Sequence, residues 1–575
     1  MFIKTTRVRD SEYIKLVESY RQDGKTEHRV LYNFGRADLI RQDESFLRIV
    51  KRLCEVAQIP LADTNNGKDS FLEDCSEATI YNYGYLAYLQ LWRELGIEYC
   101  LEDAEAGTKT TYSLQKTVFL MAIQHLLEPM NKLSTYNHQN KYLCMPETPL
   151  HHMYRALDLL SKKKEEIETG LFEYNYVRIN KTVDVVFYDL TTIHFESKIA
   201  DDLRDFGYSK AGKYNEVQVV LGMLIDANGM PVGYELYKGN TFEGKTMVKT
   251  LEAIKKRFRI NRIIIVADRG LNIKGNSNHV KEAGYGYIMA SKIKGASSAL
   301  QKKVLEDKGF VSINDKEGNI MLRYKVMEHK NIFKDENKVK HILAENMVVT
   351  YSAKRAKKDK ADRERLVEKA KKLLENPEQI TSTNKRGGRK YINNQEGPAK
   401  DKTAFELDID KIERDARFDG YYAIQTSEKA MDATEIMDAY HTLWKIEESF
   451  RIMKSTLEIR PVYHSAKTRI EGHFVVCFLA FLMERKMELL IQNEKDENCP
   501  VSPQKIQEAL NTMQLAAVTT ASQGEVFIKA KAQPLATHIF KHLKLDIPAN
   551  ISVKNDLISC FKLDSEPIPV QLAFL

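Results

Sequence analysis

The sequence predicts a multidomain α+β protein, with a mixed sheet and flanking helices that are interrupted by a β-rich insertion and preceded by a helical region. Three observations lead to this fold class. The chain has 575 residues, more than one hydrophobic core supports. Short strand-like runs alternate with helical stretches over residues 183–291. A long amphipathic helix follows near residue 432, after about 140 residues of different texture.

Composition excludes several classes of protein. With 43% hydrophobic and 29% charged residues, the chain is neither fibrous nor disordered. The longest apolar stretch, residues 474–483, is shorter than the ~20 residues of a membrane span, so we expect a buried helix and no membrane partner. The charged N-terminus lacks the apolar core of a secretory signal, which predicts a cytoplasmic protein. Seven cysteines without a C-x-x-C pair argue against a disulfide framework and a zinc finger.

Two regions precede the predicted sheet. Residues 1–110 mix strand-like and helical stretches, and we find no chemistry in them. Residues 111–178 have helical periodicity and a run of three lysines at 162–164. A helical DNA-binding region and an ordinary helical domain fit this pattern equally well.

Residues 179–295 contain the first part of the predicted core. The turn Ala227-Asn228-Gly229 is a strong hairpin signal. An all-apolar run at residues 263–267 is typical of a central strand that is covered on both faces. The expected elements, in order, are a strand ending at Asp189, strands at 217–226 and 231–237, a helix at about 243–258, a strand at 263–267, a helix, and a strand at 286–291. This is the order of the ribonuclease-H-like fold.

An insertion is expected at residues 296–430, followed by the second part of the core at 431–495 and a C-terminal region at 496–575 without an assigned role. Residues 351–400 contain 15 Lys and Arg against 7 Asp and Glu. This basic segment suits a polyanion, although a solvated lysine-rich helix would have the same composition. Within it, residues 386–390 (Arg-Gly-Gly-Arg-Lys) indicate either a phosphate-contacting loop or a solvated turn.

Two acids are expected at strand ends. Asp189 and Asp268 each directly follow an apolar strand. The carboxyl ends of strands form the edge where open α/β sheets bind ligands. Either acid taken alone is more typical of a turn than of a functional site.

The sequence of the long helix favours a functional role for these two acids over a role in turns. It begins near Asp432 with a predicted capping box, and Tyr440, Glu447 and Lys454 are spaced by seven residues, so they share one stripe. A second stripe can pack on the sheet and consists of Ile446, Phe450, Met453 and Leu457. With this facing, Glu448 points away from the core and is expected to be solvated.

Five sequence strings together resemble the insertion-sequence transposases of the DDE class, in the branch with a Y-x2-R-x3-E-x6-K signature and a β insertion before the last acid. The strings are Tyr188-Asp-Leu-Thr-Thr, Gly207-Tyr-Ser-Lys, Gly239-Asn-Thr, Val266-Ala-Asp-Arg-Gly and Tyr440-x2-Leu-x3-Glu447-x6-Lys454. The signature Arg is replaced by Leu443.

The resemblance implies that Asp189, Asp268 and Glu447 are the catalytic metal ligands. It implies that Tyr440 and Lys454 contact DNA, with Arg269 and Arg451 as further candidates. Carboxylates suit Mg²⁺, with Mn²⁺ as a substitute, and two such ions drive phosphoryl transfer in many DNA enzymes.

The implied function is DNA transposition. The enzyme would bind the terminal inverted repeats of an insertion sequence, cleave DNA at the element ends and join the 3′-hydroxyls to target DNA. We expect a homodimer in the synaptic complex, in the bacterial cytoplasm and on the nucleoid when DNA is bound. Two alternatives stay open: a ribonuclease-H-like nuclease or resolvase without strand transfer, and a catalytically silent DNA-binding relative.

The histidines do not show zinc spacing with the cysteines. We expect them on polar or DNA-facing surface; they are His151, His152, His441, His464 and His473.

Overall fold

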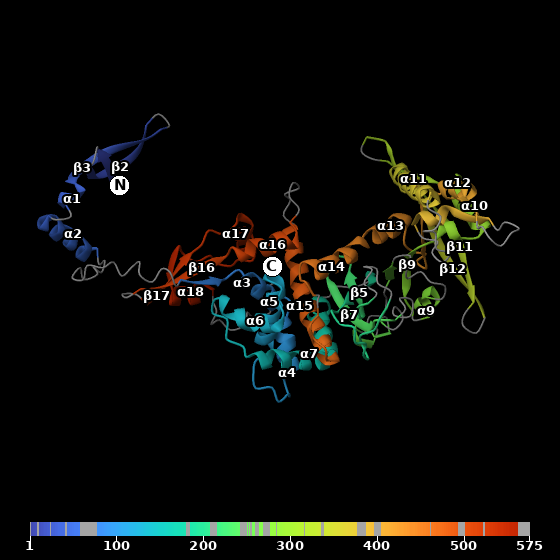
Figure 1. The fold of residues 1–575 in the computed structure, drawn as a ribbon, viewed down its shortest axis with the longest axis horizontal. Coiled ribbons are helices and arrows are strands. Elements are labelled where there is room, and N and C mark those ends of the chain that lie inside the picture. The colour runs from blue at the N-terminus through green and yellow to red at the C-terminus, as the bar shows by residue number, and fades with distance from the viewer. Residues whose placement is uncertain are drawn as a thin grey trace. The chain divides into compact units, whose positions relative to one another are not determined.

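The fold is described by a computed structural model (Figure 1). The described residues are 2–8, 11–22, 25–40, 43–57, 78–179, 185–207, 215–241, 250, 252–253, 256–258, 264–267, 276–282, 284–314, 317–334, 339–375, 387–395, 404–459, 462–492, 501–520 and 524–561. Among them, no helix combines the length and the apolar composition that crossing a bilayer demands. The five described cysteines, Cys54, Cys100, Cys144, Cys477 and Cys560, are all free thiols.

Contacts divide the chain into two units, residues 1–79 with 517–528 and residues 80–516 with 529–575. In the first unit, an antiparallel sheet in the order β1-β2-β3 precedes two helices. The ring of Phe34 packs edge-on against that of Phe46, 5.4 Å away, which holds the second helix to the sheet. The elements are β1 (Phe2–Val8), β2 (Ser11–Gln22), β3 (Lys25–Arg36), α1 (Ala37–Ile40) and α2 (Glu44–Val56).

A group of helices in the second unit surrounds α15 (Lys467–Gln492), which contacts α3, α5 and α7. Residues 474–483 are all buried within it, as the apolar run predicts. A Cβ at Gly472 would lie 2.0 Å from the carbonyl oxygen of Leu157, so glycine allows α15 to approach α7 closely. The other helices are α3 (Leu86–Glu94), α4 (Ile97–Glu105), α5 (Leu114–Leu127), α6 (Lys132–His138) and α7 (Leu150–Phe172). The helical pattern expected for 111–178 is therefore confirmed.

The described strands of this unit include a nine-stranded mixed sheet in the order β10-β11-β12-β15-β9-β8-β5-β6-β7. β5, β8 and β9 are parallel, and the remaining pairings are antiparallel. The strands that form the predicted core are β5 (Val185–His194), β6 (Gln218–Asp226), β7 (Pro231–Lys238), β8 (Ile264–Ala267) and β9 (Gly286–Ala290), with α9 (Asn276–Glu282) before the last. The helix expected at about 243–258 lies mostly outside the described residues.

The predicted hairpin turn joins β6 to β7. Gly229 has a φ of +86°, a conformation that glycine adopts without strain. The Asp226 carboxylate accepts hydrogen bonds from the backbone N–H groups of Asn228 and Met230, at 2.8 and 2.9 Å. The turn is thus fixed by its own first residue.

The expected insertion contains strands, as predicted, but also helices, and several of its strands extend the core sheet beyond β9. Its basic segment begins with a 23-residue helix, α11, whose apolar side packs on Tyr391 and Ile392. The elements are α10 (Ser298–Leu305), β10 (Val311–Asn314), β11 (Ile320–Lys334), β12 (Lys340–Tyr351), α11 (Ala353–Glu375), β13 (Ile392–Gln395), β14 (Ala404–Leu407), α12 (Ile409–Ala416) and β15 (Tyr421–Thr426).

Residues 387–391 form a 3₁₀ helix and not a loop or a solvated turn. Arg389 is buried with its guanidinium 4.9 Å from the centre of the Phe405 ring. The ammonium of Lys390 forms an ion pair with Asp415. Both expectations for this stretch are therefore wrong in its described part, and Arg386 lies outside the described residues.

The predicted long helix is in fact two helices, α13 (Ala433–His441) and α14 (Trp444–Ser455). The capping box at Asp432 and Glu435 is confirmed. Between the helices, the backbone N–H of Leu443 bonds to the carbonyl of Tyr440 and that of Ile446 to Leu443. These three-residue hydrogen bonds tighten the chain, so the expected single continuous helix from residue 432 past Lys454 is wrong.

The remaining elements are β4 (Thr79–Asn82), α16 (Pro503–Asn511), β16 (Gln514–Thr520), β17 (Gly524–Lys529), α17 (Pro534–His542), β18 (Ile551–Val553) and α18 (Lys554–Phe561).

Candidate active site

Asp189 lies in the middle of β5 and not at its end, contrary to expectation. The strand continues because residues 190–194 pair with β6, up to the pair His194↔Gln218. The described parallel pairing with β8 stops earlier, at Phe187↔Val266. The half-buried Asp189 therefore lies two residues beyond the last described β5–β8 pair.

Asp268 and Arg269 lie outside the described residues. The strand before them, β8, is completely buried over Ile264–Ala267, as the apolar run predicts. In the sequence, Asp268 stands two residues after Val266, just as Asp189 stands two residues after Phe187.

Two polar contacts hold α14 alongside β5. The ammonium of Lys445 donates to the carbonyl oxygen of Ala227 at 2.9 Å, next to Asp226, which pairs with Val186 of β5. Nine residues later, the ammonium of Lys454 donates to the hydroxyl of Thr191. The helix thus runs beside β5 from the level of residue 186 to that of residue 191.

Asp189 lies between these two levels on the strand, and Glu447 lies between the two lysines on the helix. The predicted apolar stripe faces inward, since Ile446, Phe450, Met453 and Leu457 are all buried. Glu447 is exposed, and no described residue forms an ion pair or a hydrogen bond with its carboxylate. The arrangement leaves this carboxylate available to a ligand.

Glu448 is not solvated, so that expectation is wrong. Its carboxylate forms an ion pair with Arg485 of α15 at 3.1 Å, and its side chain is only 24% exposed. Arg485 also binds Glu488 at 2.7 Å and donates to the carbonyl oxygen of Gly229 at 3.3 Å. Glu448 therefore fastens α14 to α15.

The candidate DNA contacts are not all brought together. Tyr440 belongs to α13, where its hydroxyl accepts a hydrogen bond from Tyr422 of β15. The guanidinium of Arg355 on α11 lies 4.4 Å from the centre of the Tyr422 ring. Arg451 is largely exposed and pairs with Glu448 at 3.2 Å.

Two glycines from separate sequence strings meet beside β6. A Cβ at Gly207 would lie 2.2 Å from the carbonyl oxygen of Gly239, and one at Gly239 would lie 2.0 Å from that of Gln218. The Gln218 amide donates to the Gly239 carbonyl at 2.8 Å. Only glycine fits at either position, although Tyr208 to Lys210 lie outside the described residues.

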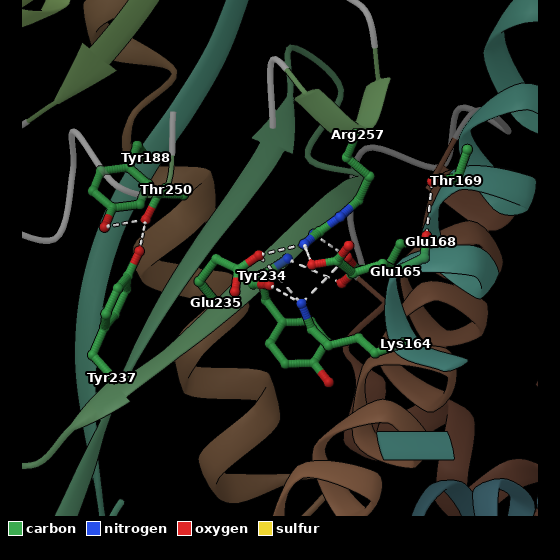
Figure 2. Close-up of polar contacts among 10 residues, drawn as sticks. All are labelled: Lys164, Glu165, Glu168, Thr169, Tyr188, Tyr234, Glu235, Tyr237, Thr250 and Arg257. Carbon is green, nitrogen blue, oxygen red and sulfur yellow. Dashed lines mark hydrogen bonds and ion pairs between the residues drawn. The ribbon is translucent and has the colours of Figure 1, made fainter. Parts of the chain in front are cut away.

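Figure 2 shows a buried charge cluster that joins α7 to β7. The guanidinium of Arg257 contacts Glu168 of α7 and binds Glu235 of β7 at 2.8 Å. The ammonium of Lys164 lies 3.4 Å from Glu168 and 3.3 Å from Glu235. Burial raises the pKa of Glu168 despite the two cations. In the same view, the hydroxyl of Thr250 bridges those of Tyr188 and Tyr237.

The sequence matches two family models. The transposase DDE domain matches residues 182–483, more than half of the chain. The N-terminal domain of the IS1634 family of transposases matches residues 3–63. The chain belongs to the DDE transposase family.

Three solved structures show weak similarity to this transposase. A piggyBac transposase synaptic complex with hairpin DNA is 7% identical over 86% of each chain, with a TM-score of 0.34. The Mos1 paired-end complex with the left transposon end is 10% identical over 31% of this chain and 60% of the other, with a TM-score of 0.14. A Mos1 mariner paired-end complex with Mn is 12% identical over 33% and 65%, with a TM-score of 0.13. No curated protein matches the chain.

Membership establishes an insertion-sequence transposase, an enzyme of the class that cuts and joins DNA with divalent metal ions. The sequence did not point to Tyr422, Arg355 or Arg485 as partners of the site. Tyr422 is positioned by the pairing of β15 with β12 and forms its hydrogen bond with Tyr440 of α13. Arg485 and Glu448 are 37 residues apart in the sequence. No local pattern marks such contacts.

Proposed function

We propose that this transposase binds the terminal inverted repeats of its insertion sequence, cleaves DNA at the element ends and joins the freed 3′-hydroxyls to target DNA. The core would be ribonuclease-H-like. The strand order β7-β6-β5-β8-β9 supports this fold, because the first strand along the chain lies between the second and the fourth. The observation that most supports the site is the pair of contacts that hold α14 beside β5.

Asp189, Asp268 and Glu447 are proposed to hold two Mg²⁺ ions, which Mn²⁺ can replace. The donors fit, because all three are carboxylates and hard cations prefer oxygen. The half-buried Asp189 and the exposed Glu447 lie on neighbouring elements. When bound, such ions activate the attacking oxygen and stabilise the leaving oxygen of a phosphodiester.

The cationic side chains would position the DNA. Lys454 is held at Thr191, two residues from Asp189 and on the same face of β5, where its ammonium can meet a phosphate beside the reacting one. Tyr440, Arg451 and Arg269 are proposed as further DNA contacts. The Arg451 side chain is 72% exposed and can contact DNA once it leaves its ion pair with Glu448.

The other regions would hold the DNA and the second subunit. We propose residues 111–178 and the basic helix α11 as DNA-binding surfaces. We propose a homodimer as the synaptic assembly, because both element ends must be held together for coordinated transfer. The domain boundaries expected from the sequence stay part of this proposal. Bound to DNA, the enzyme would lie on the nucleoid.

The test is cleavage and joining of labelled repeat-end DNA by Asp189→Asn and Asp268→Asn enzymes in Mg²⁺ and in Mn²⁺. An amide is a poor ligand for a hard cation, so both variants should lose cleavage and keep DNA binding. Asp202→Asn, at an exposed position, is the matched control. Wild-type rates in either variant would refute the assignment. Cut products without joined products in the wild type would favour the nuclease, and neither product would favour the silent DNA-binding protein.

A further inference from the structure

Three potential metal ligands meet among the helices, outside the carboxylate site. His473 and Cys477 are four residues apart on α15 and so share one face, and His125 of α5 faces them. One ligand atom of each residue lies within 4.8 Å of the other two. All three residues are buried, with exposed fractions of 6%, 0% and 3%. The expectation that His473 lies on a surface is therefore wrong.

Backbone carbonyls orient both rings. His125 Nδ1 lies 3.1 Å from the carbonyl oxygen of Leu457, and His473 Nε2 lies 3.4 Å from that of Ile459. A carbonyl only accepts, so the ring proton of His125 is on Nδ1 and its Nε2 keeps the lone pair. The Cys477 Sγ lies 3.5 Å from Nε2 of His473 and 3.9 Å from its Nδ1, so His473 can bind a metal through Nδ1 when Nε2 donates to Ile459. Metal-binding histidines are usually held in this way.

We propose that His125, His473 and Cys477 bind one Zn²⁺ ion, with the fourth position completed by water or by His464. The His464 ring centre lies 5.5 Å from that of His473. Two imidazoles and a thiol suit zinc and not Mg²⁺, because nitrogen and sulfur are the softer ligands. The Cys477 thiol binds as a thiolate, and its proton passes to solvent.

Lys132 opposes this binding. Its side chain is buried, with its ammonium 3.3 Å from His125 Nε2, the nitrogen that would bind the metal. Zinc binding therefore requires the ammonium to withdraw from that nitrogen. Since like charges at this separation repel strongly, removing the positive charge of Lys132 should tighten zinc binding.

The cluster adjoins the end of the helix that carries Glu447. Leu457 and Ile459, whose carbonyls hold the two histidines, flank Glu458, which has a φ of +42°. This left-handed conformation is strained for a residue other than glycine. A bound ion would thus stiffen the turn that ends α14. This consequence rests on the proposed function, whereas zinc binding itself does not.

The test uses the purified full-length protein and measures bound metal after equilibration with Zn²⁺. Replacement with Co²⁺ adds a signature, because a cobalt–thiolate bond gives a charge-transfer absorption that carboxylate ligands do not. With excess Mg²⁺ present to fill the carboxylate site, we expect one equivalent of zinc and the cobalt–thiolate band in the wild type. Both should be lost in Cys477→Ser and His473→Ala, and kept in Cys100→Ser, a buried thiol on α4, and in Asp189→Asn. Lys132→Met should bind about tenfold tighter or more.

Three outcomes overturn the proposal: a wild type without stoichiometric zinc, a band that survives Cys477→Ser, and a band found only in Lys132→Met. The last would mean that the ammonium is the resident cation. If His473→Ala does not fold, as judged by circular dichroism, the nearly isosteric Cys477→Ser still decides. Failure of Asp189→Asn to lose cleavage would refute the proposed function without affecting this result.

Discussion

The hydroxyl of Tyr422 donates a hydrogen bond to the hydroxyl of Tyr440, with the oxygens 2.5 Å apart. This bond ties β15 of the insertion to α13, directly before the helix that carries Glu447. Such a bond contributes about 1 kcal/mol. Without it Tyr440 is held less firmly for its proposed DNA contact, and 1 kcal/mol of lost positioning energy corresponds to roughly fivefold in a rate. Tyr422→Phe should therefore reduce single-turnover cleavage about fivefold.

The double variant with Tyr440→Phe separates a shared role from two independent roles. If the two hydroxyls act as one unit, the double variant should cleave no more slowly than the slower single variant. Tyr421→Phe, at the neighbouring strand position, should cleave at the wild-type rate. Rate reductions that multiply in the double variant would contradict a shared role.

Glu447 and Glu448 should respond differently to the same change. Glu447→Gln should abolish both cleavage and strand transfer, because the amide is a poor metal ligand. Glu448→Gln removes the negative charge opposite Arg485, but Arg485 keeps its ion pair with Glu488. The variant should therefore lose about 1–2 kcal/mol of stability and retain most of its activity. Urea denaturation and cleavage assays measure the two effects. A folded but inactive Glu448→Gln beside an active Glu447→Gln would show that the facing of α14 is wrong.

Charge reversal on α11 tests whether the basic helix meets DNA. Lys354, Lys357 and Lys358 are exposed. Changing them to Glu should weaken binding alike for all DNA sequences and flatten its salt dependence by ~0.9 for each phosphate that is no longer neutralised. Lys302→Glu, exposed on α10, serves as the control. Unchanged salt slopes would identify α11 as a solvated helix only.

The buried Glu484 should make stability depend on pH. Burial raises the pKa of its carboxyl to about 8 from a normal value of 4.5, and Tyr88 donates to it at 2.6 Å. A carboxyl whose folded pKa is raised adds stability that is complete below pH 4.5 and is lost as the pH rises through about 8. The wild type should therefore lose stability over this window.

Glu484→Gln should remove this dependence, because the amide stays neutral. Urea unfolding at pH 5.5 and pH 8 should show a larger stability loss in the wild type than in the variant. Glu508→Gln, at an exposed position, should keep the wild-type profile. Equal pH profiles for the wild type and Glu484→Gln would show that this carboxyl is ionised in the folded protein.

Features set by near neighbours were readable from the sequence alone. The capping box at Asp432 and Glu435, the turn at 227–229 and the buried helix at 474–483 all follow from residues a few positions apart. So does the apolar stripe of α14, because helical periodicity needs no distant partner.

The tertiary structure decided what depends on partners far along the chain. Asp189 is inside β5 because residues 218–222 of β6 continue to pair beyond it. Glu448 is paired and not solvated because Arg485 of another helix reaches it. His125 meets His473 and Cys477 across more than three hundred residues. Sequence periodicity shows which side of an element is apolar, but which side chains meet there depends on how the elements pack.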